Sequence, residues 1–231
     1  MGVHGGPDIV EDGLVFAVDA GNSQSYVSAS SDTFSLVSSN TGSIHNDVEF
    51  NSANQGSWVF DGVGDYVNCG HISEIQNASK VTISVWAKID DTSFRILLGQ
   101  SVALSEIFQF YYWGADTLYI WIKSGNVGTV STVDTSAIVS IGQWYNFTIV
   151  FDGTQAVNDD RCKLYINGGS DVITNRGTMP TTFTNSTESF LIGRGRNGYL
   201  DGEVANTQIY NKALTAAEIT QNYNATKQRF I

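Results

Sequence analysis

The stretch WVFDGVGDYVNCG, residues 58–70, carries the clearest fold signal in the chain. Its two apolar segments, WVF and DYV, are rich in the aromatic and β-branched residues typical of short strands. Asp61 and Gly62 between them are residue types that favour a tight hairpin turn. The stretch therefore predicts a strand, a turn at Asp61–Gly62 and a second strand.

Similar short segments recur along the whole chain, and most are closed by Gly, Asn or Asp, which tolerate turn conformations. Helical periodicity is nearly absent, and no proline- or glycine-rich linker interrupts the series. The pattern predicts one all-β domain over residues 1–231, an antiparallel two-sheet jelly roll sandwich with one short C-terminal helix. The segments are GLVFAVDA, SWVFDG, DYVNCG, KVTISVWAKID, FRILLGQ, EIFQFYYWG, TLYIWIKSG, QWYNFTIVFDG, CKLYINGG, ESFLIGRG and VANTQIYN.

The two ends of the chain differ from this pattern. Residues 1–50 predict an N-terminal strand followed by long loops, with one further strand near Val48. Residues 212–231 predict a helix and tail, because Thr215 and Glu218 have the spacing of a capping box. Ile219 and Tyr223 would share one face of that helix and dock it on the sandwich.

Composition narrows the choice of partners. Lys plus Arg number 12 and Asp plus Glu 23, a net charge of −11 that argues against nucleic acid. No apolar run approaches the ~18 residues of a membrane span, and the first residues lack the pattern of a secretory signal. Cys69 and Cys162 are too few for a disulfide framework, and we expect two reduced thiols rather than one bridge.

Six segments, taken in order, resemble a known family. Together they are similar to the laminin-G-like, concanavalin A-like jelly roll domain of lectins and glucanases, over about residues 54–224. The resemblance implies a lectin-like fold and leaves the activity open. The segments are WVFDGVGDYV, VTISVWAK, QWYNFTIVFDG, CKLYINGG, FLIGRG and IYNKALTAAEI.

The flanks of this match carry a second resemblance. GLVFAVDAGNSQSY and EITQNYNATKQRF are similar to the ends of this domain in virion structural proteins of tailed bacteriophages. That resemblance implies a protein made in the host cytoplasm and displayed outside the cell on the particle, as an oligomer among other virion proteins.

Catalytic motifs of the family are missing from the sequence. Glucanases of this fold resemble one another in a Glu-x-Asp-x-x-Glu strand that holds two carboxylates ~5–5.5 Å apart, and no glutamate here begins such a string. Lyases of similar fold carry Gln-x-His, which is also missing. The sequence therefore predicts a protein that is not an enzyme.

The acidic residues of the opening stretch suggest a weak calcium site. Asp61 and Asp65, joined by Asp19, would supply some of the six to eight oxygens that Ca²⁺ requires. Calcium-binding relatives resemble one another in an aspartate within the strand that leads to IYN, where this chain has Val204 and Ala205. The alternative is that Asp61 serves only the turn.

The remaining signal is aromatic. Because side chains alternate along a strand, VTISVWAK (81–88) sends its Val and Ile residues to one face and Trp86 and Lys88 to the other. TLYIWIK (117–123) likewise sends its Leu and Ile residues to one face and its Tyr, Trp and Lys residues to the other. Such rings stack on the C–H faces of sugars. The candidate carbohydrate-binding residues are Trp86, Tyr111, Trp113, Tyr119 and Trp121. The alternative is that these rings fill the core, or contact other subunits.

Three functions remain open at this point. The first is a virion-displayed decoration or adhesion module that binds host-surface or environmental glycans. The second is a purely structural decoration or tail protein that contacts other virion subunits. The third is a glycan-cleaving enzyme, which rests on fold analogy alone.

Overall fold

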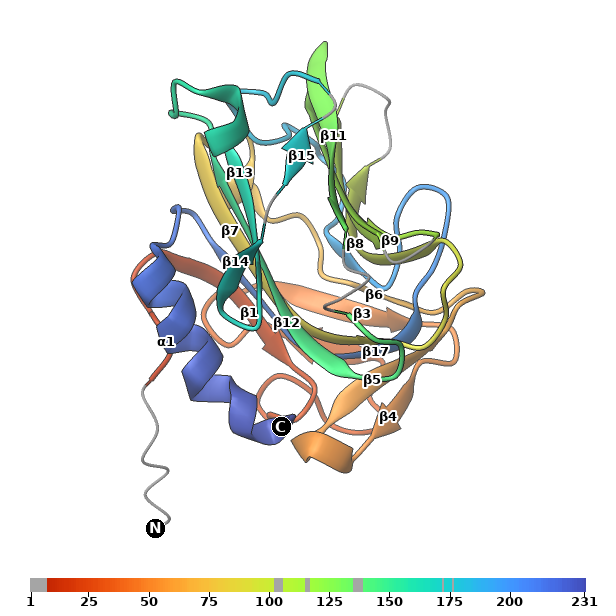
Figure 1. Ribbon diagram of the computed structural model, residues 1–231. Helices are drawn as coiled ribbons and strands as arrows, with labels where there is room; N and C mark the ends of the chain where they lie inside the picture. Colours follow the sequence, from red (N-terminus) through yellow and green to blue (C-terminus); the bar gives the residue numbers. More distant parts are fainter. Residues whose placement is uncertain (1–7, 102–105, 115–116, 135–138, 172, 176) are drawn as a thin grey trace.

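The computed structural model describes residues 8–101, 106–114, 117–134, 139–171, 173–175 and 177–231, which form two antiparallel β-sheets packed face to face (Figure 1). The eight-stranded sheet contains, in order, β14 (Gly169–Asp171), β13 (Cys162–Ile166), β12 (Trp144–Asp152), β7 (Lys80–Ile89), β17 (Asp201–Tyr210), β5 (Ser57–Asp61) and β4 (Glu49–Asn51), with β1 (Leu14–Asp19) also paired to β17.

The nine-stranded sheet contains β15 (Thr174–Asn175), β11 (Val127–Asp134), β10 (Thr117–Ser124), β9 (Glu106–Tyr112), β8 (Arg95–Ser101), β16 (Leu191–Ile192), β6 (Tyr66–Asn68), β3 (Thr41–His45) and β2 (Asp32–Phe34). Among the described residues there is one α-helix, α1 (Ala216–Thr226), and the short 3₁₀ turns are η1 (Ala53–Gln55), η2 (Ser73–Ile75), η3 (Asn158–Asp160) and η4 (Lys227–Arg229). The predicted all-β sandwich with a C-terminal helix is confirmed.

The core lies between the two sheets and follows the predicted alternation. On β7 the side chains Val81, Ile83 and Val85 point inward and are buried. On β10, Ile120 and Ile122 face them from the other sheet. Each such side chain stabilises the fold by roughly 1.5–3 kcal/mol when fully buried. A binding site is therefore expected on an outward face of one of the two sheets.

The opening stretch is not a hairpin within one sheet. Its first strand, β5, pairs with β17 and β4, whereas its second strand, β6, pairs with β3 and β16 in the other sheet. Asp61 Oδ1 accepts hydrogen bonds from the backbone N–H groups of Val63, Gly64 and Asp65. These bonds hold a longer turn that passes from one sheet to the other. The prediction of two strands is confirmed, and the prediction of a tight hairpin is wrong.

Residues 23–50 hold more strand than predicted. The strand expected near Val48 is β4, which starts at Glu49, but β2 and β3 were expected to be loop. Both are short and contain Thr or Ser. β3 is held by pairing with β6, and β2 is held by pairing with β3. Non-local pairing of this kind leaves no periodic signal in so short a segment.

The C-terminal helix packs on the outer face of the eight-stranded sheet (Figure 1). It begins as predicted, with a capping box between Thr215 and Glu218. Ile219 is buried against the sheet and the Tyr223 ring stacks on Trp86. The predicted docking of the helix is confirmed.

Two further features concern the chain as a whole. Cys69 and Cys162 are buried free thiols, and burial raises the pKa of the Cys162 thiol to about 12. No helix in the described part of the chain is long and apolar enough to span a membrane.

Candidate functional site

The outer face of the nine-stranded sheet carries the polar and aromatic side chains that the core does not use. On β10 the outward residues include Tyr119 and Trp121, and on β9 they include Gln109 and Tyr111. The strand register places Tyr119 opposite Tyr111 and Trp121 opposite Gln109. The sequence-predicted residues of these two strands therefore lie side by side on one surface.

An aromatic cluster forms at this end of the face, made of Phe94, Tyr111, Trp113 and Tyr119. The rings of Tyr111 and Tyr119 stack with centroids 4.8 Å apart. Trp113 contacts both Phe94 and Tyr119, each with centroids 6.0 Å apart. Trp113 is 53% exposed, whereas Tyr111 is only 8% exposed and serves as support for its neighbours. Phe94, which the sequence reading missed, completes the cluster from the residue before β8.

Trp86 does not belong to this face. It lies on β7 in the other sheet and is 1% exposed. Its ring stacks on Phe230 at 4.3 Å and on Tyr223 at 5.8 Å, and its indole N–H donates to Thr226 Oγ1 at 2.8 Å. A sugar has no access to a ring covered in this way. The prediction that Trp86 binds carbohydrate is therefore wrong, and the alternative that it packs in the interior is correct.

A loop rests on the middle of the outer face. Arg194 and Tyr199 form an antiparallel bridge that closes the 194–199 loop. A Cβ atom at Gly99 of β8 would lie 2.5 Å from the Arg194 carbonyl oxygen, and one at Gly195 would lie 2.5 Å from Nε2 of Gln109. At each contact one partner is a glycine, Gly99 on β8 and Gly195 in the loop, and the missing side chains let the backbone of the loop lie directly on the sheet.

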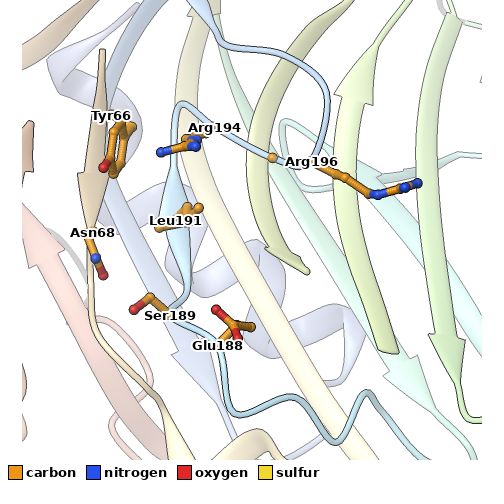
Figure 2. Close-up of a pocket in the computed structure, with 8 residues that line it drawn as sticks. Tyr66, Asn68, Glu188, Ser189, Leu191, Arg194 and Arg196 are labelled. Carbon is orange, nitrogen blue, oxygen red and sulfur yellow. The ribbon is translucent and has the colours of Figure 1, made fainter. Parts of the chain in front are cut away.

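A pocket of about 380 Å³ opens beside this loop, between it and β6. This volume falls within the roughly 300–1,000 Å³ typical of small-molecule sites. Figure 2 shows side chains from β6, from β16 and from the chain on either side of β16 gathered around it. The lining residues are Tyr66, Asn68, Glu188, Ser189, Leu191, Arg194, Gly195 and Arg196.

The Arg194 side chain is held by stacking. Its guanidinium carbon lies 4.6 Å from the centroid of the Tyr66 ring and 5.4 Å from that of Tyr199. The Tyr66 ring in turn stacks on His45 with centroids 4.3 Å apart. Each cation–π contact of this kind contributes roughly 0.5–1 kcal/mol at an exposed site. Within the described residues Arg194 has no carboxylate at ion-pair distance.

The predicted calcium ligands are occupied in other ways. Asp19 forms an ion pair with Arg229 at 2.6 Å. Hydrogen bonds from the backbone N–H groups of Gly64 and Val63 hold the pKa of Asp61 below its ordinary value. Burial, with the nearby Asp61 charge, raises the pKa of Asp65, whose carboxylate accepts from the N–H of Asp47 at 3.1 Å.

These bonds leave the three carboxylates in separate roles, two in the turn and one tied to an arginine. No group of three or more potential metal-ligating side chains occurs in the part of the chain that the structure describes. The prediction of a shared metal site at Asp19, Asp61 and Asp65 is therefore wrong. The alternative reading, that Asp61 serves the turn, is correct.

The pocket was not predicted from the sequence. Its lining comes from DYVN in the opening stretch and from ESFLIGRGRNG, more than a hundred residues later. One sequence feature could have indicated the pocket: Arg194 and Arg196 lie two residues apart in a chain that has few basic residues. The alternating sequence of β10, by contrast, was enough to predict the aromatic end of the face.

Comparisons with known proteins agree with this architecture. Residues 61–220 match the family model Laminin_G_3, described as the concanavalin A-like lectin/glucanases superfamily, and the chain belongs to this family. No curated protein sequence matches the chain.

Several solved structures are similar in fold. The receptor binding domain of botulinum neurotoxin C/D mosaic serotype is 14% identical, with a TM-score of 0.70 over 93% of this chain and 51% of that one. This chain thus spans about half of that binding domain. Domain 4 of an extracellular arabinanase from Geobacillus stearothermophilus, in complex with arabinotriose, is 16% identical, with a TM-score of 0.70 over 93% of this chain and 100% of that one. A Trypanosoma rangeli sialidase in complex with sialic acid is 14% identical, with a TM-score of 0.66. The match covers 94% of this chain and 34% of the sialidase chain.

Proposed function

We propose that this protein is a non-enzymatic carbohydrate-binding module that binds glycans on the outer face of its nine-stranded sheet. One observation carries the proposal. A pocket lined by polar side chains and an aromatic cluster lie on the same face, on either side of the 194–199 loop. A glycan chain offers both kinds of group along its length, because each sugar has C–H faces and hydroxyl edges.

The lining of the pocket supports this reading. Asn68 Nδ2, Ser189 Oγ and the Glu188 carboxylate line the space without a side-chain hydrogen bond to another described residue. Leu191 adds an apolar surface beside them, on the side toward Arg194. Unused donors and acceptors around an apolar patch suit a ligand that carries many hydroxyls.

The similar structures support the same class of ligand. The arabinanase domain is matched over its full length and is described in complex with arabinotriose, an oligosaccharide. Its identity to this chain is low, so the likeness bears on the fold and leaves the identity of the sugar open. A shallow single site of this kind gains strength from multiple copies, which fits weak binding made effective by avidity.

The carboxylates of the site support binding rather than cleavage. A glycosidase of the common two-carboxylate type places a pair ~5–9.5 Å apart across the bond that it cleaves. Glu188 is the single carboxylate among the pocket-lining residues. The alternative, a glycan-cleaving enzyme, predicts release of reducing sugar from the polysaccharide that the protein binds, and we expect none.

Where the protein acts is inferred from the sequence alone. The resemblance of the two flanks to tailed-phage virion proteins supports display on a bacteriophage particle, among other virion subunits, where glycans of the host surface or of the environment would be the ligands. A purely structural decoration or tail protein is the alternative, in which the exposed ring of Trp113 would contact a neighbouring subunit.

Replacing Trp121 by alanine is expected to weaken binding at least about tenfold, equivalent to about 1.4 kcal/mol, because its half-buried ring would lose its contact with the sugar. The measurement is binding to an immobilised panel of neutral and acidic oligosaccharides, followed by titration calorimetry with the best ligand. Phe34→Ala is the matched control, since Phe34 is an exposed aromatic residue on β2, at the far edge of the same sheet.

Three outcomes would count against the proposal. A wild-type protein that binds nothing on the panel contradicts the glycan-binding function. Equal binding by wild type and Trp121→Ala removes Trp121, and with it that part of the β10 outer surface, from the site. Release of sugar from a bound polysaccharide overturns the assignment as a non-enzyme.

A further inference from the structure

We propose that the pocket beside the 194–199 loop binds the carboxylate group of an acidic sugar, with Arg194 as the residue that recognises the charge. This inference rests on the proposed function, because it names the class of glycan that the outer face takes. Three observations support it: Arg194 has no ion-pair partner among the described residues, the pocket lining has a net positive charge, and Arg194 and Glu188 lie at opposite ends of the pocket.

Arg194 and Arg196 differ from the other arginines described in the structure. Arg95 and Arg229 form ion pairs with aspartates, and Arg161 donates to the carbonyl groups of Gln155 and Met179. Arg194 and Arg196 have no such partner among the described residues. The chain has only 12 basic residues against 23 acidic ones, so two uncompensated arginines in one pocket are unusual. Their charge is left available to an external anion.

The geometry of Arg194 favours a planar anion. The rings of Tyr66 and Tyr199 cover its guanidinium group, at 4.6 and 5.4 Å from the guanidinium carbon. No carboxylate or carbonyl group among the described residues accepts a hydrogen bond from the guanidinium N–H groups, so they are available to donate to a ligand. Such a fork matches the two oxygens of a carboxylate in a bidentate pair. The stacking also holds the side chain in place before the ligand arrives, which lowers the entropic cost of binding.

The other end of the pocket suits hydroxyl groups. In Figure 2, Arg194 and Glu188 lie on opposite sides of Leu191, with Arg194 turned toward Tyr66. Their charged groups form no ion pair with each other. Glu188 can accept hydrogen bonds from sugar hydroxyls, and Ser189 can donate or accept beside it. A ligand that carries a carboxylate at one end and hydroxyls at the other would satisfy both ends at once.

The charge of the lining favours one negative charge over several. Two arginines and one glutamate give a formal charge of +1 from the lining residues. Figure 2 shows Arg196 extended away from the pocket across the neighbouring strands, so it would act at longer range than Arg194. A phosphate dianion or a heavily sulfated chain would be repelled by Glu188 and by the net charge of −11. A sugar with a single carboxylate per unit is the better match.

Two pairs of probes test this inference by titration calorimetry. The first pair is trigalacturonate and its carboxyl-reduced neutral counterpart, and the second is 3′-sialyllactose and lactose. We expect at least one acidic probe to bind at least tenfold more tightly than its neutral counterpart, and the pair that shows the difference identifies a hexuronic or a sialic type of acid. Raising the salt concentration from ~0.05 to ~0.5 M should weaken only the acidic probe, because screening acts on the charge pair.

Arg194→Gln is expected to remove this tenfold preference, so that the acidic probe binds no more tightly than its neutral counterpart. Lys163→Gln is the matched control, because it removes the same charge from an exposed position on β13 of the other sheet, and it should keep the preference. Thermal unfolding of both variants reports whether they are folded. Arg194→Lys, which keeps the charge but loses the stacked fork, should recover only part of the preference.

The inference is overturned if neither acidic probe is preferred, if salt has no effect on the preferred one, or if Arg194→Gln binds it as wild type does. These outcomes are distinct from failure of the proposed function. Neutral glycans that bind in a Trp121-dependent way, with no preference for acids, would uphold the glycan-binding face and reject the acidic-sugar pocket. A protein that binds no sugar at all would reject both.

Discussion

Replacing Trp86 by alanine is expected to lower the free energy of unfolding by about 3–5 kcal/mol, the usual cost of removing a fully buried large aromatic side chain. The ring lies between β7 and the C-terminal segment, stacked on Tyr223 and Phe230 and hydrogen-bonded to Thr226. Its removal would leave a cavity and free the helix from the sheet. Urea denaturation, followed by tryptophan fluorescence and by circular dichroism, measures the change.

Trp113→Ala is the matched control for this prediction. Trp113 is 53% exposed and makes only edge and tilted contacts, so its loss should cost less than about 1 kcal/mol. The two variants should also differ in binding, with Trp86→Ala keeping the glycan affinity of the fraction that remains folded. Equal destabilisation by the two variants would contradict the placement of Trp86 under the helix.

Replacing Gly99 by alanine should both destabilise the fold and damage the site. The new methyl group would lie 2.5 Å from the Arg194 carbonyl oxygen and 2.8 Å from the Gly195 Cα, so the loop would have to move off the sheet. Overpacking of this kind costs about 1–3 kcal/mol. Because the loop carries both arginines of the pocket, we expect glycan affinity to fall about tenfold in protein that is still folded. Urea denaturation and calorimetry measure the two effects.

Gly169→Ala provides the control for this variant. A methyl group at Gly169, on β14 of the other sheet, would approach nothing closer than the Ile166 carbonyl oxygen at 3.6 Å, an ordinary contact. Neither stability nor binding should change appreciably. If Gly99→Ala behaves like Gly169→Ala, the 194–199 loop does not rest on β8 as described.

The parts of the fold that could be predicted from the sequence are those set by local rules. Alternation along 81–88 and 117–123 predicted which side chains enter the core, because alternate side chains of each strand point between the two sheets. Thr215 and Glu218 predicted the start of the helix because the capping box is formed by residues three apart. Both predictions depend on contacts within a single element.

What could not be predicted depends on which elements meet. Alternation places both Trp86 and Trp121 on the outward face of their strands. Trp86 is nevertheless buried, because the C-terminal helix covers its sheet, whereas no helix covers Trp121 among the described residues. β16 is two residues long and lies between β8 and β6, which are far from it in sequence. The pocket exists because of that pairing, which leaves no local pattern in the chain.

The opening stretch illustrates both cases. WVF and DYV were predicted as strands from their composition, and Asp61 as a turn residue. The turn, however, connects the two sheets, and this brings Tyr66 and Asn68 to the outer face of the second one. The stretch that best indicates the fold thus also supplies one wall of the candidate site.

Chemical-shift mapping on the ¹⁵N-labelled protein tests the central claim most directly. Titration with the tightest-binding glycan of the panel should shift backbone amide signals of β6, β16, the 194–199 loop, β9 and β10, all on or beside the outer face of the nine-stranded sheet. Signals of α1 and of β7 should stay in place. Shifts that cluster around α1 or on the outer face of the eight-stranded sheet would contradict the account, as would unchanged spectra at saturating glycan.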